Sequence, residues 1–227
     1  MIIPIPQVLT PSQVESMRAQ LDAAIWVDGA STAGGQAIGV KQNHQLAQNH
    51  PLAQSLGDAI LSALAQHPLF ISAALPLKIY PPMFNRYEGG EAYGWHVDNA
   101  LRIVPGTSVR VRTDLSATVF LSEPDEYEGG DLCIEDKFGC QRVKLNAGDM
   151  ILYPSTSIHC VEPVTKGARV SAFFWLQSMI RSHEQRDQLF DLDQSIQSLS
   201  SSLSSQNKDL VRLTGLYQRL IQQWSDT

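Results

Sequence analysis

The middle of the chain, residues 78–177, breaks into short β-rich runs separated by turn residues, with no helical pattern between them. The expected strands cover residues 78–86, 93–97, 117–121, 131–134, 141–145, 150–153, 157–161 and 168–176. Parallel strands need long crossovers that are usually helical, whereas antiparallel strands can follow one another through tight turns. We therefore expect an antiparallel jelly roll in this region and not a Rossmann-type parallel sheet.

Apolar residues recur at helical spacing on both sides of this β-rich region. Before it, Thr10, Pro11 and Gln13 suit the N-cap, first and third positions of a helix, and a second helix is expected over residues 52–64. After it, two amphipathic helices are expected, the first of which continues through the serine-rich run 198–205. Their apolar stripes need a partner, either the home sheet or the same helices of a second subunit in a homodimer.

The length of 227 residues suits one sizeable core with a small appendage. The fold class is α+β, mainly β, with a jelly-roll core, N-terminal helices and a C-terminal helical pair. We place the main domain at residues 1–178, with its β core at 78–177, and a C-terminal helical extension at 179–227.

Composition limits the partners that this chain can have. The formal net charge of −6 provides no positive field for a phosphate backbone, so no nucleic-acid partner is expected. No stretch approaches the ~20 apolar residues of a membrane span, and the first residues lack the features of a signal peptide. The three cysteines lack zinc-site spacing and are interpreted as reduced thiols. These features predict a cytoplasmic protein without a membrane partner.

Two separated segments carry residues that suit a metal. His96 and Asp98 lie two residues apart in an expected strand, so both side chains should project to one face. His159 follows in a later expected strand, between apolar neighbours. Each of these residues alone has a simpler explanation as a surface or core residue. Together they form a set of two histidines and one carboxylate, which leaves adjoining positions on a six-coordinate ferrous ion open.

A basic residue is expected close to this set. Arg169 follows His159 by ten residues and shares strand parity with Ser171, so it can face the same interior. A guanidinium inside a barrel is unfavourable unless an anion meets it, and its planar fork suits a carboxylate. The alternatives are an internal salt bridge and a bound acidic ligand, and the position after His159 favours the ligand.

The order of His96, Asp98, His159 and Arg169 within a β-rich core resembles the iron(II)/2-oxoglutarate-dependent dioxygenases, specifically their PKHD-type (prolyl/lysyl-hydroxylase-like) hydroxylases. The sequences Trp26-Val27-Asp28-Gly29, Thr32-Ala33-Gly34 and Arg112-Thr113-Asp114-Leu115-Ser116-Ala117 also resemble that family.

The resemblance implies a double-stranded β-helix of the cupin-like type in a dioxygenase domain. It implies one Fe(2+) per subunit on His96, Asp98 and His159, and 2-oxoglutarate held by Arg169. Ser171 and Tyr87 are assigned to the same co-substrate, Tyr87 by its match to a tyrosine of related prolyl hydroxylases. L-ascorbate is implied as a reductant and O2 as a reactant. The expected reaction hydroxylates an aliphatic C–H bond of a peptide or small molecule, with 2-oxoglutarate converted to succinate.

Two other functions are compatible with the same residues. One is a non-catalytic β-helix sensor that binds a metal or a small acid, and the other is a zinc-dependent hydrolase or isomerase. The polar segment 99–111 is either a lid or a surface hairpin, and it supplies Asn99, Arg102 and Arg110 as candidate substrate residues. Lys41 and Asn43 are weaker candidates.

Overall fold

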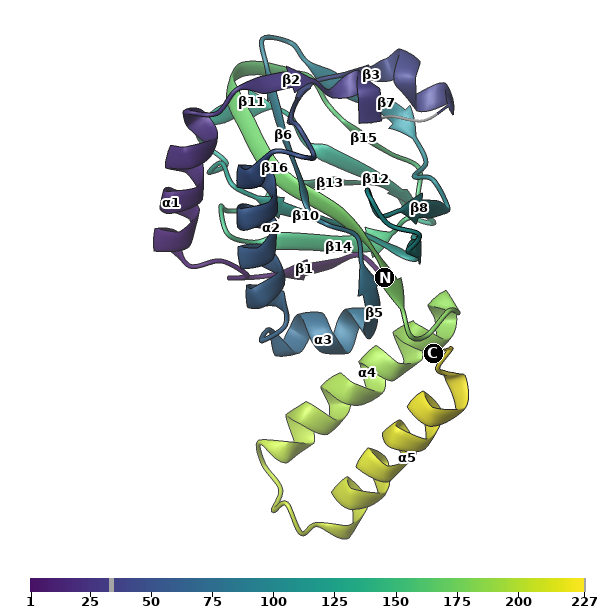
Figure 1. Ribbon diagram of the computed structural model, residues 1–227. Coiled ribbons are helices and arrows are strands. Elements are labelled where there is room, and N and C mark those ends of the chain that lie inside the picture. The colour runs from purple at the N-terminus through teal and green to yellow at the C-terminus, as the bar shows by residue number, and fades with distance from the viewer. Residues whose placement is uncertain (33–34, 227) are drawn as a thin grey trace.

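The computed structural model describes residues 1–32 and 35–226 and confirms a mainly β core with helices at both ends of the chain (Figure 1). The larger of two facing sheets has nine strands, in the order β1-β14-β10-β16-β6-β4-β2, with β5 and β11 also paired to β16. Its strands are β1 (Ile3–Ile5), β2 (Trp26–Asp28), β4 (His44–Leu46), β5 (Pro76–Ile79), β6 (Met83–Glu88), β10 (Leu115–Phe120), β11 (Tyr127–Gly129), β14 (Met150–Pro154) and β16 (Val164–Ser178).

The smaller sheet has five strands in the order β13-β12-β15-β7-β3. Its strands are β3 (Lys41–Gln42), β7 (Ala92–His96), β12 (Leu132–Asp136), β13 (Gly139–Val143) and β15 (His159–Val161). A separate ribbon joins β8 (Leu101–Ile103) to β9 (Arg110–Arg112). Every strand pair among the described residues is antiparallel, as the tight turns in the sequence predict.

The larger sheet is buried on both faces, and the alternation of side chains along β16 explains how. Phe174 and Leu176 point into the main hydrophobic core, which the helices complete. Arg169 and Trp175 have the opposite parity and line the space between the two sheets, and Ser171, on the same face, is hydrogen-bonded to Arg169. One long central strand therefore contributes to the core and to the cavity at once.

Helices from the first third of the chain cover the outer face of the larger sheet (Figure 1). They are α1 (Pro11–Asp22), α2 (Pro51–Leu64) and α3 (Pro68–Ala74), and two 3₁₀ helices, η1 (Gly29–Thr32) and η2 (Gly35–Val40), lie between α1 and β3. The capping box of α1 is confirmed, because Thr10 and Gln13 each accept a hydrogen bond from the other's backbone N–H. This segment is rich in glycine, a composition typical of loops, yet its described residues form these two short helices. Ala33 and Gly34, from the family-like segment, lie outside the described residues.

Helix α3 was not expected from the sequence, since seven residues are too few to show helical periodicity. It begins after His67, whose ring accepts a hydrogen bond from the N–H of Phe70, and it ends at Leu75 in a left-handed conformation. Burial of Phe70 against the main core stabilises this short helix more than its intrinsic propensity does.

The C-terminal helices α4 (His183–Ser200) and α5 (Lys208–Trp224) form an antiparallel hairpin that projects away from the β core (Figure 1). Their apolar stripes face each other and, at the base of the hairpin, pack with Leu75 and Ile180. The expected partners for these stripes were the home sheet or a second subunit. In the structure the two helices cover each other's stripes instead. Helix α4 ends at Ser200, so the expected helix through Ser205 is wrong. The homodimer stays a prediction that sedimentation analysis can test.

Two local expectations for the β region also differ from the structure. The strand expected at 78–86 is divided into β5 and β6 at Pro81-Pro82, because proline lacks the N–H that a ladder needs. The strand expected at 168–176 is longer, because β16 begins at Val164, so Lys166 and Gly167 lie within the strand and not in a turn before it. Gly167 has a φ of +71°, and a Cβ there would lie 2.0 Å from the carbonyl oxygen of Glu126. The glycine therefore allows close approach of β11, not a reversal of the chain.

No helix among the described residues is both long and apolar enough to span a membrane.

Candidate active site

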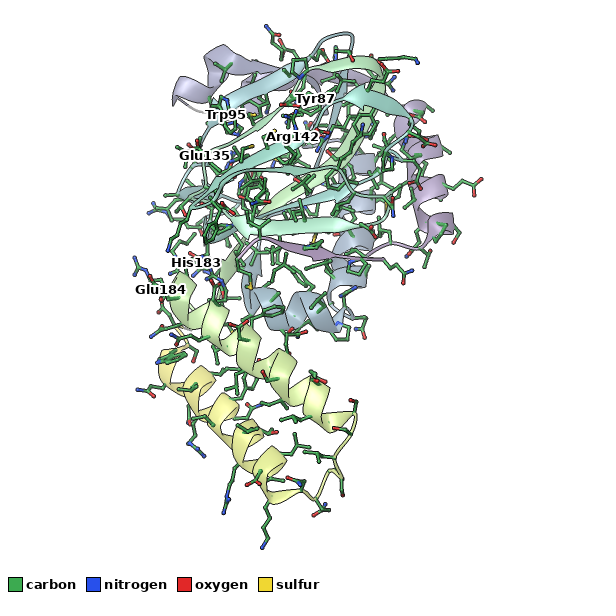
Figure 2. All side chains as sticks on the ribbon, turned by 180° about the vertical axis from the view of Figure 1, so that it is seen from behind. Tyr87, Trp95, Glu135, Arg142, His183 and Glu184 are labelled. Carbon is green, nitrogen blue, oxygen red and sulfur yellow. The ribbon has the colours of Figure 1, made fainter. Side chains whose placement is uncertain are left out.

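A cavity opens between the two sheets and collects the polar side chains that both sheets turn inward. In Figure 2, Tyr87 lies within the β core, whereas His183 and Glu184 mark the start of α4, at the edge of that core. The lining residues are Lys41, Gln45, Asn85, Tyr87, Tyr93, His96, Asp98, Arg102, Ser116, Ala117, Thr118, Leu132, Tyr153, His159, Val161, Arg169, Phe173, Phe174 and Trp175.

His96, Asp98 and His159 come together in this cavity. His96 ends β7 and is the register partner of His159 on β15, and the centroids of the two rings are 4.2 Å apart. One ligand atom from each histidine and one from Asp98 lie within 4.8 Å of one another. Among the described residues, no other group of three or more acidic, histidine or cysteine side chains meets this criterion.

The position of Asp98 has a different cause from the one that the sequence suggested. Strand β7 ends at His96, so strand alternation does not direct the Asp98 side chain. Ser116 on β10 donates a hydrogen bond to Asp98 Oδ2 at 2.6 Å, and its hydroxyl is also bonded to that of Ser155 at 2.8 Å. The larger sheet thus holds the carboxylate opposite the histidines. No motif in the sequence marks Ser116 as a site residue, and its one signal is that Ser116 and Thr118 are polar residues in an otherwise apolar strand.

Both histidines have their rings fixed by backbone carbonyls. His96 Nδ1 is 2.8 Å from the oxygen of Gly94, and His159 Nδ1 is 3.0 Å from that of Ser157. A carbonyl can only accept, so each Nδ1 carries the proton and each Nε2 has a free lone pair. Burial, and next the neighbouring His159 ring, lower the pKa of His96 to about 4, which keeps it neutral near neutral pH. The ring of Tyr93 stacks on His96 with centroids 3.6 Å apart.

This donor set fits a ferrous ion. Two imidazole nitrogens and one carboxylate oxygen are the ligands of non-haem iron oxygenases, in which the remaining positions serve co-substrate and oxygen. The carbonyls that orient the imidazoles, and the serine on the carboxylate, are the kind of outer contacts that tune such ligands.

Arg169 brings a positive charge into the same cavity without a protein counter-ion. Its side chain is 1% exposed, and its Nη1 donates to Ser171 Oγ at 2.8 Å. Within the described part of the chain, no carboxylate forms an ion pair with Arg169, and its buried Nε lacks a hydrogen-bond partner. The internal salt bridge considered from the sequence is therefore not found there. A buried guanidinium of this kind needs an anion, and a ligand carboxylate fits that requirement.

Ser171 and Tyr87 lie beside Arg169. Ser171 Oγ donates to Asn85 Oδ1 at 2.5 Å, and the Arg169 guanidinium is 5.6 Å from the ring centroid of Tyr87. Burial raises the pKa of Tyr87 to about 12, so its hydroxyl keeps its proton and can act as a donor. Asn85, on β6, was missed because it lies in an expected strand and outside any motif.

The three candidate substrate residues have different positions. Arg102 lines the cavity, with its guanidinium carbon 3.8 Å from the ring centroid of Trp175. Asn99 and Arg110 are exposed and lie outside the cavity lining. On β9 the inward position belongs to Val111, which is buried, so the neighbouring Arg110 faces outward.

Comparisons with known proteins agree with this geometry. Residues 82–177 match the 2OG-Fe(II) oxygenase superfamily, and residues 183–226 match the PKHD-type hydroxylase C-terminal domain. A PKHD-type hydroxylase of Burkholderia cenocepacia is 55% identical over 226 residues, with 100% of both chains covered.

Two solved structures share the fold at low identity. A Pseudomonas putida prolyl-4-hydroxylase has a TM-score of 0.52 at 19% identity, covering 78% of this chain and 92% of that chain. HygX from Streptomyces hygroscopicus, with nickel, 2-oxoglutarate and hygromycin B bound, has a TM-score of 0.52 at 17% identity, covering 78% of this chain and 82% of that one. From the full-length identity, the chain belongs to the PKHD-type hydroxylases, enzymes of the 2OG-Fe(II) oxygenase superfamily.

Proposed function

We propose that this enzyme hydroxylates an aliphatic C–H bond of a peptide or small molecule, using O2 and 2-oxoglutarate. His96, Asp98 and His159 hold one ferrous ion in each subunit. Arg169, Ser171 and Tyr87 bind 2-oxoglutarate, with the guanidinium on the carboxylate remote from the metal. The proposal depends above all on one observation, the buried guanidinium of Arg169 that lacks a carboxylate partner in the cavity of the His–Asp–His cluster.

The order of side chains on β16 supports this division of the cavity. Arg169 and Ser171 lie at one end of its inward face, and Trp175 lies toward the other, near the ribbon that carries Arg102. The co-substrate would occupy the arginine end, leaving the aromatic end for the substrate. HygX, which shares the fold, binds nickel, 2-oxoglutarate and a second organic molecule, hygromycin B, in one structure.

The oxidising chemistry comes from ferrous iron with O2 and 2-oxoglutarate, which yields carbon dioxide, succinate and a hydroxylated product. The protein's own residues hold and shield the reactants. The carbonyls of Gly94 and Ser157 accept from Nδ1 of the two histidines and fix the ring orientations, so that Nε2 of each ring can bind the metal. Ser116 fixes the Asp98 carboxylate, and Tyr87 keeps a protonated hydroxyl as a donor. The buried walls around them exclude water from the reacting atoms.

Succinate release tests the proposal directly. Wild-type protein loaded with ferrous iron should convert 2-oxoglutarate to succinate only in the presence of O2, and ascorbate should prolong the reaction by keeping the iron reduced. Asp98→Ala should abolish succinate formation, whereas the control Asp125→Ala, which alters an exposed carboxylate, should leave it unchanged. Equal succinate release from wild type and Asp98→Ala would reject the site.

Mass spectrometry identifies the product. Cell extract treated with wild-type enzyme should contain a compound that has gained one oxygen atom and is absent after treatment with Asp98→Ala. Such a compound in both samples would show that this cavity does not carry out the hydroxylation.

A further inference from the structure

The inner face of the larger sheet carries a block of buried polar side chains beside Arg169. Strand β6 lies between β16 and β4, so a residue of β6 can face a partner on each side. Asn85 is opposite Ser171 on β16 and opposite Gln45 on β4, and all three side chains are buried. Burial of polar groups is unfavourable unless they are hydrogen-bonded, so this block needs a reason other than packing.

The next row of this block begins with Arg169, which is the register partner of Tyr87 on β6. Asn43 immediately precedes β4, whose register with β6 pairs His44 with Arg86. Continued by one residue, the same register places Asn43 opposite Tyr87, on the face that points to the cavity. Arg169, Tyr87 and Asn43 therefore form one row across the sheet.

Asn43 is held in this row by close packing against Gly29. The Gly29 N–H donates to the backbone oxygen of Asn43 at 2.8 Å. A Cβ on Gly29 would lie 1.9 Å from Asn43 Oδ1, so a side chain there would displace the amide. Because Oδ1 lies against Gly29, Nδ2 is the amide atom left to face Tyr87.

The Asn43 side chain is buried without a complete hydrogen bond of its own. It is 3% exposed, and neither Oδ1 nor Nδ2 has a hydrogen-bond partner among the described residues. Burial raises the pKa of Tyr87, while Arg169 and then Asn43 act in the opposite direction. An amide lowers the pKa of a phenol by donating to its oxygen, which agrees with Nδ2 facing the Tyr87 hydroxyl.

A donor on the phenol oxygen decides where the Tyr87 proton points. A phenol has one proton and can also accept a hydrogen bond. When Nδ2 of Asn43 donates to the oxygen, the proton is directed away from Asn43 and toward the part of the cavity beside Arg169. A carboxylate at that position can accept from the guanidinium and from the phenol together.

We propose that Asn43 is a positioning residue for the co-substrate: its amide donates to the Tyr87 oxygen and turns the Tyr87 proton toward the 2-oxoglutarate carboxylate that Arg169 binds. Asn43 acts through Tyr87, since it lies outside the cavity lining. Gly29 provides the space that the amide needs. This inference rests on the proposed function, because it assumes that 2-oxoglutarate occupies the Arg169 end of the cavity and accepts from Tyr87.

A double-mutant cycle on 2-oxoglutarate affinity tests this role. The protein is loaded with Zn(II), which supports no turnover, and the Kd is measured by titration calorimetry. Asn43→Leu, which keeps the size of the side chain and removes its donor, should raise the Kd about threefold to tenfold, as expected for one neutral hydrogen bond. In a Tyr87→Phe background the same substitution should change the Kd by less than about twofold, because no hydroxyl is left to orient.

Two further variants separate this role from a role in folding. Gln42→Leu replaces the exposed amide next to Asn43 and should leave the Kd unchanged. Gly29→Ala keeps both side chains but displaces the Asn43 amide, so it should also raise the Kd, and only while the Tyr87 hydroxyl is present. All of these variants should bind Zn(II) as wild type does, since none alters a metal ligand.

The outcomes separate this inference from the proposed function. A wild-type Kd in Asn43→Leu, or a rise of equal size with and without the Tyr87 hydroxyl, would overturn the positioning role. Loss of Zn(II) binding in both Asn43→Leu and Gly29→Ala would also overturn it, because the amide would then serve folding; if only one of them loses Zn(II), the Kd of the other decides. Failure of the Zn(II)-loaded wild type to bind 2-oxoglutarate would instead reject the proposed function, and this inference with it.

Discussion

Replacing Arg169 with methionine should strengthen the fold and weaken co-substrate binding at the same time. The substitution removes a buried charge that has no counter-ion among the residues that the structure describes, and it keeps a flexible chain of similar length. The one hydrogen bond lost, to Ser171, contributes about 1 kcal/mol. Ser171 retains its bond to Asn85, so no orphaned hydroxyl is left behind.

The expected gain in unfolding free energy follows from the removed charge and the lost hydrogen bond. Replacing even a paired buried charge with apolar side chains of similar volume is often neutral or stabilising by about 1–4 kcal/mol, and a charge without a protein partner lacks the attraction that offsets its desolvation. After subtraction of the Ser171 bond, metal-free Arg169→Met should gain up to roughly 3 kcal/mol in free energy of unfolding. For a chain of this length that raises Tm by up to about 12 °C.

The loss of 2-oxoglutarate affinity should be larger. A guanidinium can donate two charge-assisted bonds to one carboxylate, each contributing about 1.5–3 kcal/mol. We expect the Kd of the Zn(II)-loaded variant to rise roughly 100-fold to 1,000-fold. Urea unfolding measures the first effect and titration calorimetry the second.

A higher unfolding free energy together with a lower 2-oxoglutarate affinity distinguishes a ligand-binding arginine from a structural one. The matched control is Arg142→Met on the exposed face of β13, which should leave the Kd unchanged. Were Arg169→Met to lower the unfolding free energy by about 3–5 kcal/mol while binding 2-oxoglutarate normally, Arg169 would belong to a structural network and the reasoning would fail.

Three further changes give distinct signatures. Asp98→Ala should leave a folded protein with an unchanged circular dichroism spectrum that no longer binds Fe(II) or Zn(II) in equilibrium dialysis. Ser116→Ala should keep the metal but weaken it about 10-fold to 100-fold, because Asp98 loses its fixed orientation; equal affinity would show that the contact is incidental. Gly167→Ala should lower the midpoint of urea unfolding, because a φ of +71° and a Cβ 2.0 Å from the Glu126 oxygen both oppose the methyl group; an unchanged midpoint would contradict that.

Much of the larger architecture could be predicted because it depends on local patterns. Short β-rich runs with glycine turns predict antiparallel pairing, and the parity of Arg169 and Ser171 correctly predicts that they share a face. The same reasoning failed for Asp98, since strand alternation holds only while the strand continues and β7 ends at His96.

The contacts that orient the site could not be predicted. Ser116 contacts Asp98 across the two sheets, since β10 belongs to the larger sheet and β7 to the smaller one. The two strands are not paired, so strand pairing could not have predicted this contact. The sequence likewise could not show that Arg102 lines the cavity whereas Arg110 is exposed. Both lie in one polar segment, and only the register of β8 with β9 turns the first inward and the second outward.

The position of each group within the fold indicates which parts of the enzyme can change between relatives. Arg169 lies on β16, a central strand whose other face carries Phe174 in the main core, so a change there affects stability and the proposed co-substrate site together. Lys41 lies on β3, a strand of two residues at the edge of the smaller sheet, and Arg102 lies on a ribbon outside both sheets. Substitutions at these peripheral positions should alter the charge that lines the cavity with little effect on the core. We therefore expect the cavity wall to vary among relatives through β3 and β8, while the residues proposed to hold metal and co-substrate remain constrained by the sheets that carry them.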